Sequence, residues 1–291
     1  MKIIENNGTV REPVSQEEEL HVIRHSAAHV MAQAIKRLYP DAHFAYGPAT
    51  EKGFYYDVDL GGVKLVDGDL GKIEAEMKKI VKENLPIKPF ILPREEAVKL
   101  MQERGEIYKV EHIADLPESE PISFYQQGEY IDMCVGPHVM YTKAVKAFKL
   151  TQVSGAYWKG DKSNKMLTRI NGIAFASQEE LETYVKLQEE AEKRDHNKIG
   201  RDLEYFTTVD VIGQGLPVLL PKGARVIQLL QRWVEDVEQE KGYELTKTPL
   251  FAKREFYKIS GHWDHYLDGM FVLGDPNDYT KDCFALRPMT C

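Results

Sequence analysis

The chain has 291 residues, of which 43% are hydrophobic and 29% charged, and its formal net charge is −8. This composition belongs to a soluble globular protein of roughly two domains. No apolar run approaches the roughly 20 residues of a membrane span, and the N-terminus lacks the apolar region of a signal peptide, so both are excluded. Cys134, Cys283 and Cys291 stand at unrelated spacings, which argues against a disulfide framework and favours a reducing cytoplasm.

The first predicted helix follows a tail or short strand at residues 1–14 and begins at Ser15. Ser15 and Glu18 have the spacing of a capping box, in which each side chain satisfies a backbone N–H of the other. The apolar periodicity continues to about Tyr39, directly before Pro40. We therefore expect a helix of about six turns here.

The next segments alternate between strand and helix patterns. Strands are predicted at 43–47 and 53–59, helices at about 69–84 and 94–104, and mostly short strands from 105 to about 176. Helices interleaved with antiparallel strands predict an α+β fold, with helices packed on an antiparallel sheet.

The last third of the chain begins with a charged helix. Residues 178–201 have only a thin apolar face, as in a connector between domains. Beyond it we expect a helix at about 222–241 and a strand at 243–247. The predicted organisation is a leader (1–19), a first domain (20–177), a linker helix (178–202) and a second domain (203–291).

Two histidines stand four residues apart in the first predicted helix. His25 and His29 therefore share one face of it, one turn apart. That face lies opposite the apolar stripe centred on Ala27. We expect the two imidazoles to lie outside the core, either in a site or exposed on the surface.

A second pair gives this spacing more weight. In Asp132-Met-Cys134-Val-Gly-Pro-His138 a Gly-Pro turn separates the cysteine from the histidine, so their side chains can face one point. Together the two pairs offer three imidazoles and a thiol. This is a ligand set for tetrahedral zinc, and equally a metal-free acid–base cluster with a thiol neighbour. We expect all four side chains to meet in one polar cleft.

Two charged residues are further candidates for that cleft. Asp132 can orient a histidine, and Lys109 can stabilise a developing oxyanion. By its spacing alone, Lys109 fits a surface lysine better than a site residue.

A basic stretch stands out in this acidic chain. Residues 141–171 carry seven lysines and arginines against the single Asp161, with Tyr157 and Trp158 among them. Such a stretch can hold phosphates and stack bases, or it can be a solvated strand edge protected by lysines.

Several motifs resemble the editing domain of threonyl-tRNA synthetases, a domain related to those of alanyl-tRNA synthetases and free-standing editing proteins. Besides the two pairs, they are Ala45-Tyr-Gly-Pro48, Gly53-Phe-Tyr-Tyr-Asp57, Tyr108-Lys109, Ser154-Gly-Ala-Tyr-Trp-Lys-Gly-Asp161 and Asn164-Lys-Met-Leu167. Downstream, residues 193–200, 260–266 and 286–291 are typical of the same synthetases. The resemblance covers about residues 20–291.

The resemblance implies roles for individual residues. In such enzymes this pocket receives the 3′ end of tRNA and hydrolyses serine wrongly esterified to threonine tRNA. The implied catalytic residues are His25, His29, Lys109, Asp132, Cys134 and His138. Substrate binding is assigned to Tyr56, Gly47, Tyr157 and Trp158, and tRNA binding to Lys159, Lys162, Lys165 and Arg169.

The resemblance also implies parts beyond this sequence. The class II synthetase core, an antiparallel sheet, starts at about 203 and is incomplete at Cys291, which matches the first of three zinc ligands of the synthetic site. We expect a part of a longer ligase that does not itself attach threonine. The full-length enzyme is expected to use zinc and Mg-ATP, bind tRNA(Thr), form a homodimer and work in the cytoplasm, with no cofactor for editing.

Three alternatives stay open. The chain could be a zinc-dependent editing protein of the alanyl-related type, with His25, His29, Cys134 and His138 as ligands. It could be a tRNA-binding fragment without catalysis. Cys134 could also act as a covalent nucleophile, although water suffices to attack an activated ester.

Overall fold

The computed structural model describes residues 1–118 and 120–289. It divides into two compact units, residues 1–194 and 195–291, and each is described by itself. None of the helices in the described residues is long and apolar enough to cross a membrane.

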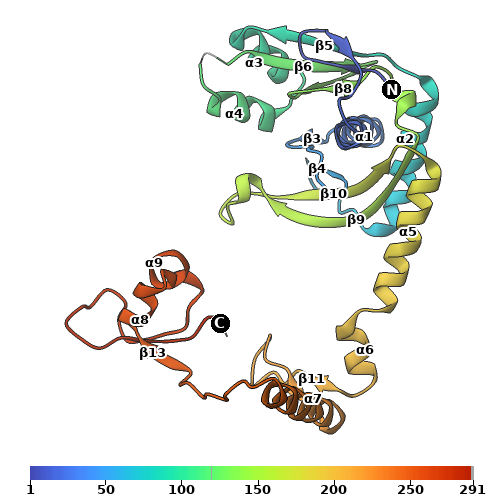
Figure 1. The fold of residues 1–291 in the computed structure, drawn as a ribbon. Helices are drawn as coiled ribbons and strands as arrows, with labels where there is room; N and C mark the ends of the chain where they lie inside the picture. The colour runs from blue at the N-terminus through green and yellow to red at the C-terminus, as the bar shows by residue number, and fades with distance from the viewer. Residues whose placement is uncertain (119, 290–291) are drawn as a thin grey trace. The chain divides into compact units, whose positions relative to one another are not determined.

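A central helix, α1 (Gln16–Leu38), organises the first unit (Figure 1). The Ser15 hydroxyl accepts the Glu18 N–H at 3.1 Å and so caps the helix, as predicted. The Glu18 carboxylate binds the Val14 N–H and Arg11, so the reciprocal half of the capping box is not formed.

Helix α1 is buried almost all round. Between Val22 and Ile35 only His25 is partly exposed, because α2, β4, β8 and β10 all pack against this helix. His29 is 1% exposed, so the alternative of an exposed surface histidine is wrong for it, and the alternative of a histidine in a site remains. A second packing layer covers the side opposite the apolar stripe.

Two antiparallel sheets lie on either side of α1 in Figure 1. The first has the order β3 (His43–Phe44), β4 (Phe54–Asp59), β10 (Met166–Phe175), β9 (Ala147–Tyr157), and packs with α1 and α2 (Leu70–Glu83) in the main core. The second has the order β5 (Ile87–Leu92), β6 (Ile122–Gln127), β7 (Tyr130–Met133), and shares a smaller core with α3 (Arg94–Glu103) and α4 (Ile107–Asp115).

The N-terminal residues join a third, small sheet. Its order is β2 (Val10–Arg11), β1 (Ile3–Ile4), β8 (His138–Val139). Ile4 pairs with His138, and Ile3 is fully buried. Strand β1 thus holds the segment that follows the Gly-Pro turn.

The described first unit confirms the α+β prediction, and the described residues up to 202 correct three details of the predicted elements. The segment 105–176 is not mostly short strands, because it contains α4 and a long hairpin of β9 and β10 that the turn 158–165 joins. Strand β5 was not predicted; its pairing with β6 is a long-range contact. The predicted linker helix is two helices, because α5 (Gln178–Lys193) ends before Asp195, whose side chain caps α6 (His196–Asp202).

The second unit contains the predicted helix as α7 (Pro221–Glu240). Besides α6, its other elements are β11 (Phe206–Thr207), β12 (Val218–Leu219), β13 (Phe251–Lys253), α8 (Arg254–Ile259), α9 (His262–Tyr266), β14 (Val272–Leu273) and β15 (Phe284–Leu286). A small core forms around Tyr257, Trp263 and Cys283. The strand predicted at 243–247 is not formed, because no described segment pairs with it.

Candidate active site

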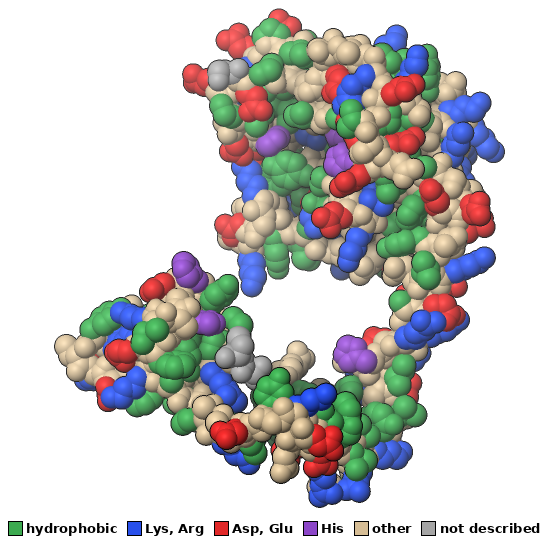
Figure 2. Space-filling model, viewed as in Figure 1, with side chains coloured by type: hydrophobic (Ala, Val, Ile, Leu, Met, Phe, Trp, Pro, Cys, Tyr) green, Lys and Arg blue, Asp and Glu red, His purple; other side chains and the backbone are tan. Residues whose placement is uncertain are grey.

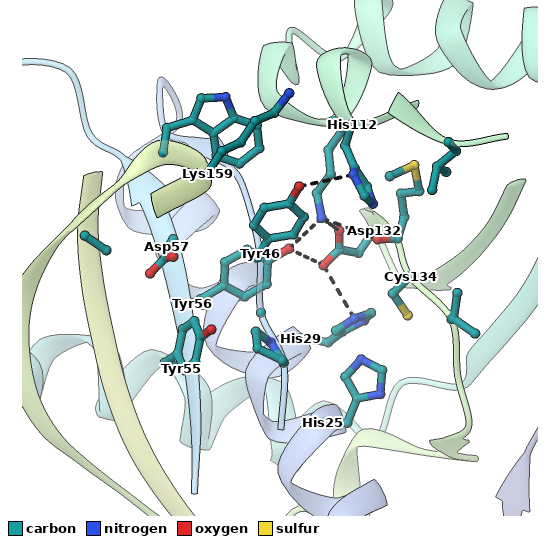
Figure 3. A pocket seen from close by; sticks show the side chains of 18 of the residues that line it. His25, His29, Tyr46, Tyr55, Tyr56, Asp57, His112, Asp132, Cys134 and Lys159 are labelled. Carbon is teal, nitrogen blue, oxygen red and sulfur yellow. Dashed lines mark hydrogen bonds and ion pairs between the residues drawn. The ribbon is translucent and has the colours of Figure 1, made fainter. Parts of the chain in front are cut away.

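A cavity of about 710 Å³ lies between the two large sheets of the first unit (Figure 2). His25 and His29 of α1 line it, together with Tyr56 of β4 and Lys109 of α4. Asp132 and Cys134 reach it from β7 and the turn that follows (Figure 3). Segments more than 100 residues apart in sequence therefore contribute to one cleft.

Three imidazoles and one thiol meet at the inner end of this cleft. One potential ligand atom from each of His25, His29, Cys134 and His138 lies within 4.8 Å of all the others. The His138 ring centroid is 4.1 Å from that of His25 and 4.1 Å from that of His29. The predicted convergence of the two pairs is confirmed.

His138 lies behind the cavity wall. It has no exposed surface and is not among the lining residues, whereas Cys134 is. Its Nε2 is 3.0 Å from the Cys134 sulfur. His138 can therefore act on a bound molecule only through its neighbours.

A buried ion pair stands beside this cluster. Lys109 Nζ lies 2.7 Å from Asp132 Oδ1 and donates to the Tyr56 hydroxyl at 3.0 Å and the Met133 carbonyl at 3.3 Å. The Tyr56 hydroxyl donates to Asp132 Oδ2 at 2.5 Å. All three hydrogens of the ammonium thus have acceptors inside the protein.

The other side of Asp132 faces the histidines. Its Oδ2 lies 3.5 Å from His29 Nε2, so the carboxylate can hold a hydrogen on that nitrogen. His29 Nδ1 is buried and has no hydrogen-bond partner among the described residues. His29 is therefore a base whose second nitrogen is free to accept a proton.

Burial sets the protonation states of the cluster. Desolvation, together with neighbouring His29, lowers the pKa of His25 to about 3. Desolvation also lowers the pKa of His29 to about 4, against the opposing effect of Asp132. All three imidazoles are neutral at pH 7, since burial holds the pKa of His138 well below its ordinary value too.

The pKa values of Asp132 and Cys134 are shifted in opposite directions. Burial opposes the charge of Asp132, but Lys109 and His29 outweigh it and keep its pKa below the ordinary value. Burial raises the pKa of the Cys134 thiol well above its ordinary range. The cleft therefore holds a carboxylate and a protonated thiol, which is a poor nucleophile.

Aromatic rings line the outer part of the cavity. Tyr46 stacks on Trp158 with ring centroids 5.1 Å apart, and its hydroxyl lies 3.1 Å from His112 Nδ1. Trp158 donates to Glu111 at 2.8 Å, while Tyr157 is 42% exposed. Gly47 also lines the wall, where a Cβ atom would overlap the Tyr56 ring.

The four basic residues predicted to bind tRNA differ in their surroundings. Arg169 forms a bidentate pair with Asp57, Lys165 pairs with Asp59 at 2.6 Å, and Lys159 pairs with Asp115 at 2.5 Å. Lys162 is exposed and makes no ion pair within residues 1–118 and 120–289. Three of these charges are therefore already balanced by carboxylates.

Some residues of the site were not identified from the sequence. Tyr130 lies 3.4 Å from Asp132 Oδ2, and Ser26 contacts His138 Nδ1 at 3.0 Å. Tyr130 could have been inferred, because it stands two residues before Asp132 in a strand and so shares its face. Cys291, predicted as a zinc ligand, lies outside the described residues.

The four-residue cluster can be tested for its fit to zinc. Three nitrogens, one sulfur and the unpartnered His29 Nδ1 suit the metal chemically, and Asp132 stands where a carboxylate orients a ligand histidine. The Cys134 sulfur and His138 Nε2, however, are at hydrogen-bond distance, 3.0 Å. Two ligands of tetrahedral zinc would lie roughly 3.5 Å apart. A zinc ion fits only if these two side chains separate.

Known proteins match this chain in two ways. Residues 122–171 match the family described as the threonyl and alanyl tRNA synthetase second additional domain. A threonine-tRNA ligase of Clostridium perfringens is 59% identical to this chain over 93% of the chain. One of Clostridium botulinum is 56% identical over the whole of this chain. One of Geobacillus kaustophilus is 52% identical over 94% of the chain. The chain spans only 41% to 46% of these relatives' length.

Proposed function

This chain belongs to the threonyl-tRNA synthetase family, and we propose that the cavity of its first unit hydrolyses serine esterified to threonine tRNA. The family match at residues 122–171 includes Asp132, Cys134 and His138. The observation that carries the proposal is a buried Asp132–His29 pair at the wall of that cavity, in which His29 Nδ1 has no hydrogen-bond partner among the described residues.

Such a reaction meets a physical need. Serine lacks one methyl group of threonine and fits any site that accepts threonine. One such group provides only about 1–3 kcal/mol of discrimination, so a second site must remove the wrong product. That site can exclude the larger amino acid by size.

The chemistry required is ester hydrolysis. A water oxygen attacks the ester carbonyl carbon, the bond to the terminal ribose oxygen breaks, and the water's proton ends on that oxygen. His29, oriented by Asp132 and neutral at pH 7, supplies the acceptor for the proton. Cys134 offers a weak S–H donor at the cavity wall.

The geometry favours a different role for Lys109 than oxyanion binding. Its three hydrogens are directed at Asp132, Tyr56 and Met133, so none is left for a substrate. We assign it to keep Asp132 ionised and in place. Tyr56 shares this task, because its hydroxyl bonds both charged groups.

Deacylation of charged tRNA by this chain tests the proposal. Release of serine from Ser-tRNA(Thr) with Thr-tRNA(Thr) largely spared is expected, and His29→Ala should slow it by about 10²–10⁴, the contribution of a general base. His265→Ala, at an exposed histidine of the second unit, is the matched control. Undiminished activity in His29→Ala would contradict the assignment, and tRNA binding without deacylation would support a non-catalytic fragment.

A zinc-dependent hydrolase is a second candidate, favoured by the approach of the four potential ligand atoms within 4.8 Å. In that case His25, His29, Cys134 and His138 would hold the ion, and the ion would activate water. Elemental analysis separates the two. About one zinc per chain that is lost in Cys134→Ser supports it, whereas activity that survives EDTA supports the metal-free site.

The remaining assignments follow from the relatives. We propose that the longer enzyme attaches threonine to tRNA(Thr) with Mg-ATP and a zinc ion in its synthetic site, as a homodimer in the cytoplasm, and that the second unit is part of its class II core. Free thiols at Cys134 and Cys283 fit a reducing compartment.

A further inference from the structure

Ser26 is a buried residue of α1 that none of the roles above uses. Its side chain has no exposed surface, and it stands directly after His25 in the helix. Its hydroxyl oxygen lies 3.0 Å from His138 Nδ1 and accepts the Val139 N–H at 3.0 Å. His138 in turn contacts the Cys134 sulfur through Nε2 at 3.0 Å. A continuous row of hydrogen bonds therefore runs from α1 to the cavity wall.

The hydrogens in this row can be counted. A serine hydroxyl has one hydrogen and two acceptor lone pairs, and the Val139 N–H occupies one lone pair. Within the described chain, His138 Nδ1 is the one acceptor at hydrogen-bond distance from that hydroxyl. If Nδ1 carried a hydrogen instead, the hydroxyl hydrogen would be buried without a partner, which is unfavourable.

The ring itself is neutral for a geometric reason. His138 is enclosed by the rings of His25, His29 and Tyr125, with centroids 4.1, 4.1 and 4.4 Å away. It contacts no carboxylate among the described residues. A buried imidazole without an anionic partner stays uncharged, so one of its nitrogens carries the hydrogen and the other accepts.

We infer that Ser26 is a positioning residue that donates its hydroxyl hydrogen to His138 Nδ1 and thereby fixes the tautomer with hydrogen on Nε2. The Nε2–H then donates to the Cys134 sulfur, and the thiol hydrogen is free to turn into the cavity.

This arrangement determines what Cys134 can do. His138 has no lone pair left for the thiol, so it cannot take the thiol proton and generate a nucleophile. Cys134 instead remains a donor toward a bound molecule. This consequence for catalysis rests on the proposed ester hydrolysis, whereas the tautomer does not.

Nitrogen-15 NMR of the histidines in the EDTA-treated chain tests the tautomer directly. The expected result is a pyridine-like Nδ1 signal and a pyrrole-like Nε2 signal for His138. The two signals are assigned to His138 because they disappear in His138→Gln. In Ser26→Ala the Nδ1 signal should lose the shift caused by its hydrogen bond. The reverse tautomer, or a spectrum unchanged in Ser26→Ala, would overturn the inference.

Two variants decide which neighbour sets the tautomer. Cys134→Ala removes the sulfur and should leave hydrogen on Nε2, since Ser26 is intact; a switch to Nδ1 would assign the control to Cys134. Ser123→Ala is the matched control, because Ser123 is a buried serine that bonds the Cys134 carbonyl at 2.7 Å and does not contact His138. It should leave the His138 nitrogen signals unchanged.

Deacylation provides a separate readout. Ser26→Ala should lower kcat about three- to tenfold with little change in KM, the loss expected for one neutral hydrogen bond. If the NMR result holds while the parent chain does not deacylate Ser-tRNA(Thr), the tautomer inference stands and the proposed function fails.

Discussion

The Nζ atom of Lys109 and the Oδ1 atom of Asp132 lie 2.7 Å apart, with side chains only 6% and 2% exposed. The sequence did not predict this ion pair, because Lys109 lies in α4 and Asp132 lies in β7, two segments that are separate along the chain. A buried pair of this kind stabilises little overall but makes the loss of one partner severe.

Asp132→Ala should therefore lower the free energy of unfolding by about 3–5 kcal/mol, because Lys109 would be left charged and unpaired. Urea unfolding of the first unit, followed through the methyl resonances of the buried Met31 and Met77, measures this. Lys193→Met is the control, since Lys193 and Glu190 are 69% and 49% exposed and their pair should contribute less than about 1 kcal/mol. Equal losses of unfolding free energy in the two variants would show that burial of the ion pair does not determine the cost of removing one partner.

Gly47→Ala should displace the Tyr56 ring, because the new Cβ would overlap it. Tyr56 is fully buried and bonds both Asp132 and Lys109, so stability and deacylation should fall together. Gly71→Ala is the matched control. Gly71 lies exposed near the start of α2 with open space around it, so alanine there should stabilise by up to about 1 kcal/mol.

The first unit should lose stability between pH 6.5 and about 4. The folded state holds the pKa of His29 at about 4, below the ordinary 6.5, so the unfolded chain binds more protons in this window. The stabilisation is complete above pH 6.5 and is lost as the pH falls toward 4. Its size for His29 is on the order of 3 kcal/mol at 1.36 kcal/mol per pKa unit.

The same methyl resonances in urea at pH 7 and pH 5 measure this effect. His29→Gln should reduce the difference between the two pH values, and the remainder should come from His25 and His138, whose pKa values are lowered in the same direction. If the stability difference between pH 7 and pH 5 is the same in His29→Gln as in the parent chain, the lowered pKa assigned to His29 is wrong.

Lys162→Ala should weaken tRNA binding more than Lys165→Ala. Lys162 has no ion-pair partner in the described residues and is free to meet a phosphate, while Lys165 already pairs with Asp59. Removing one phosphate contact should reduce the slope of log K against log salt by about 1. Binding titrations at several salt concentrations test this, and identical slopes for the two variants would rule it out.

The sequence determined much of this protein because its signals are local. The four-residue spacing of His25 and His29 places them on one helix face, and the Gly-Pro turn brings Cys134 to His138; both follow from backbone geometry over a few residues. The caps and apolar periodicity likewise located α1, α2, α3 and α7 to within one or two residues.

Only the tertiary structure decided the rest. Packing of β8 and β10 on both sides of α1 buried His29, and the pairing of β1 with β8 set His138 behind the cavity wall. Lys109 became the partner of Asp132 because α4 and β7 share one small core. Lys159 found its carboxylate on α4, and Lys165 and Arg169 found theirs on β4. These are contacts between residues far apart in the chain, and the burial they create fixes which histidines are neutral, which lysine is paired and which nitrogen of His138 carries its hydrogen.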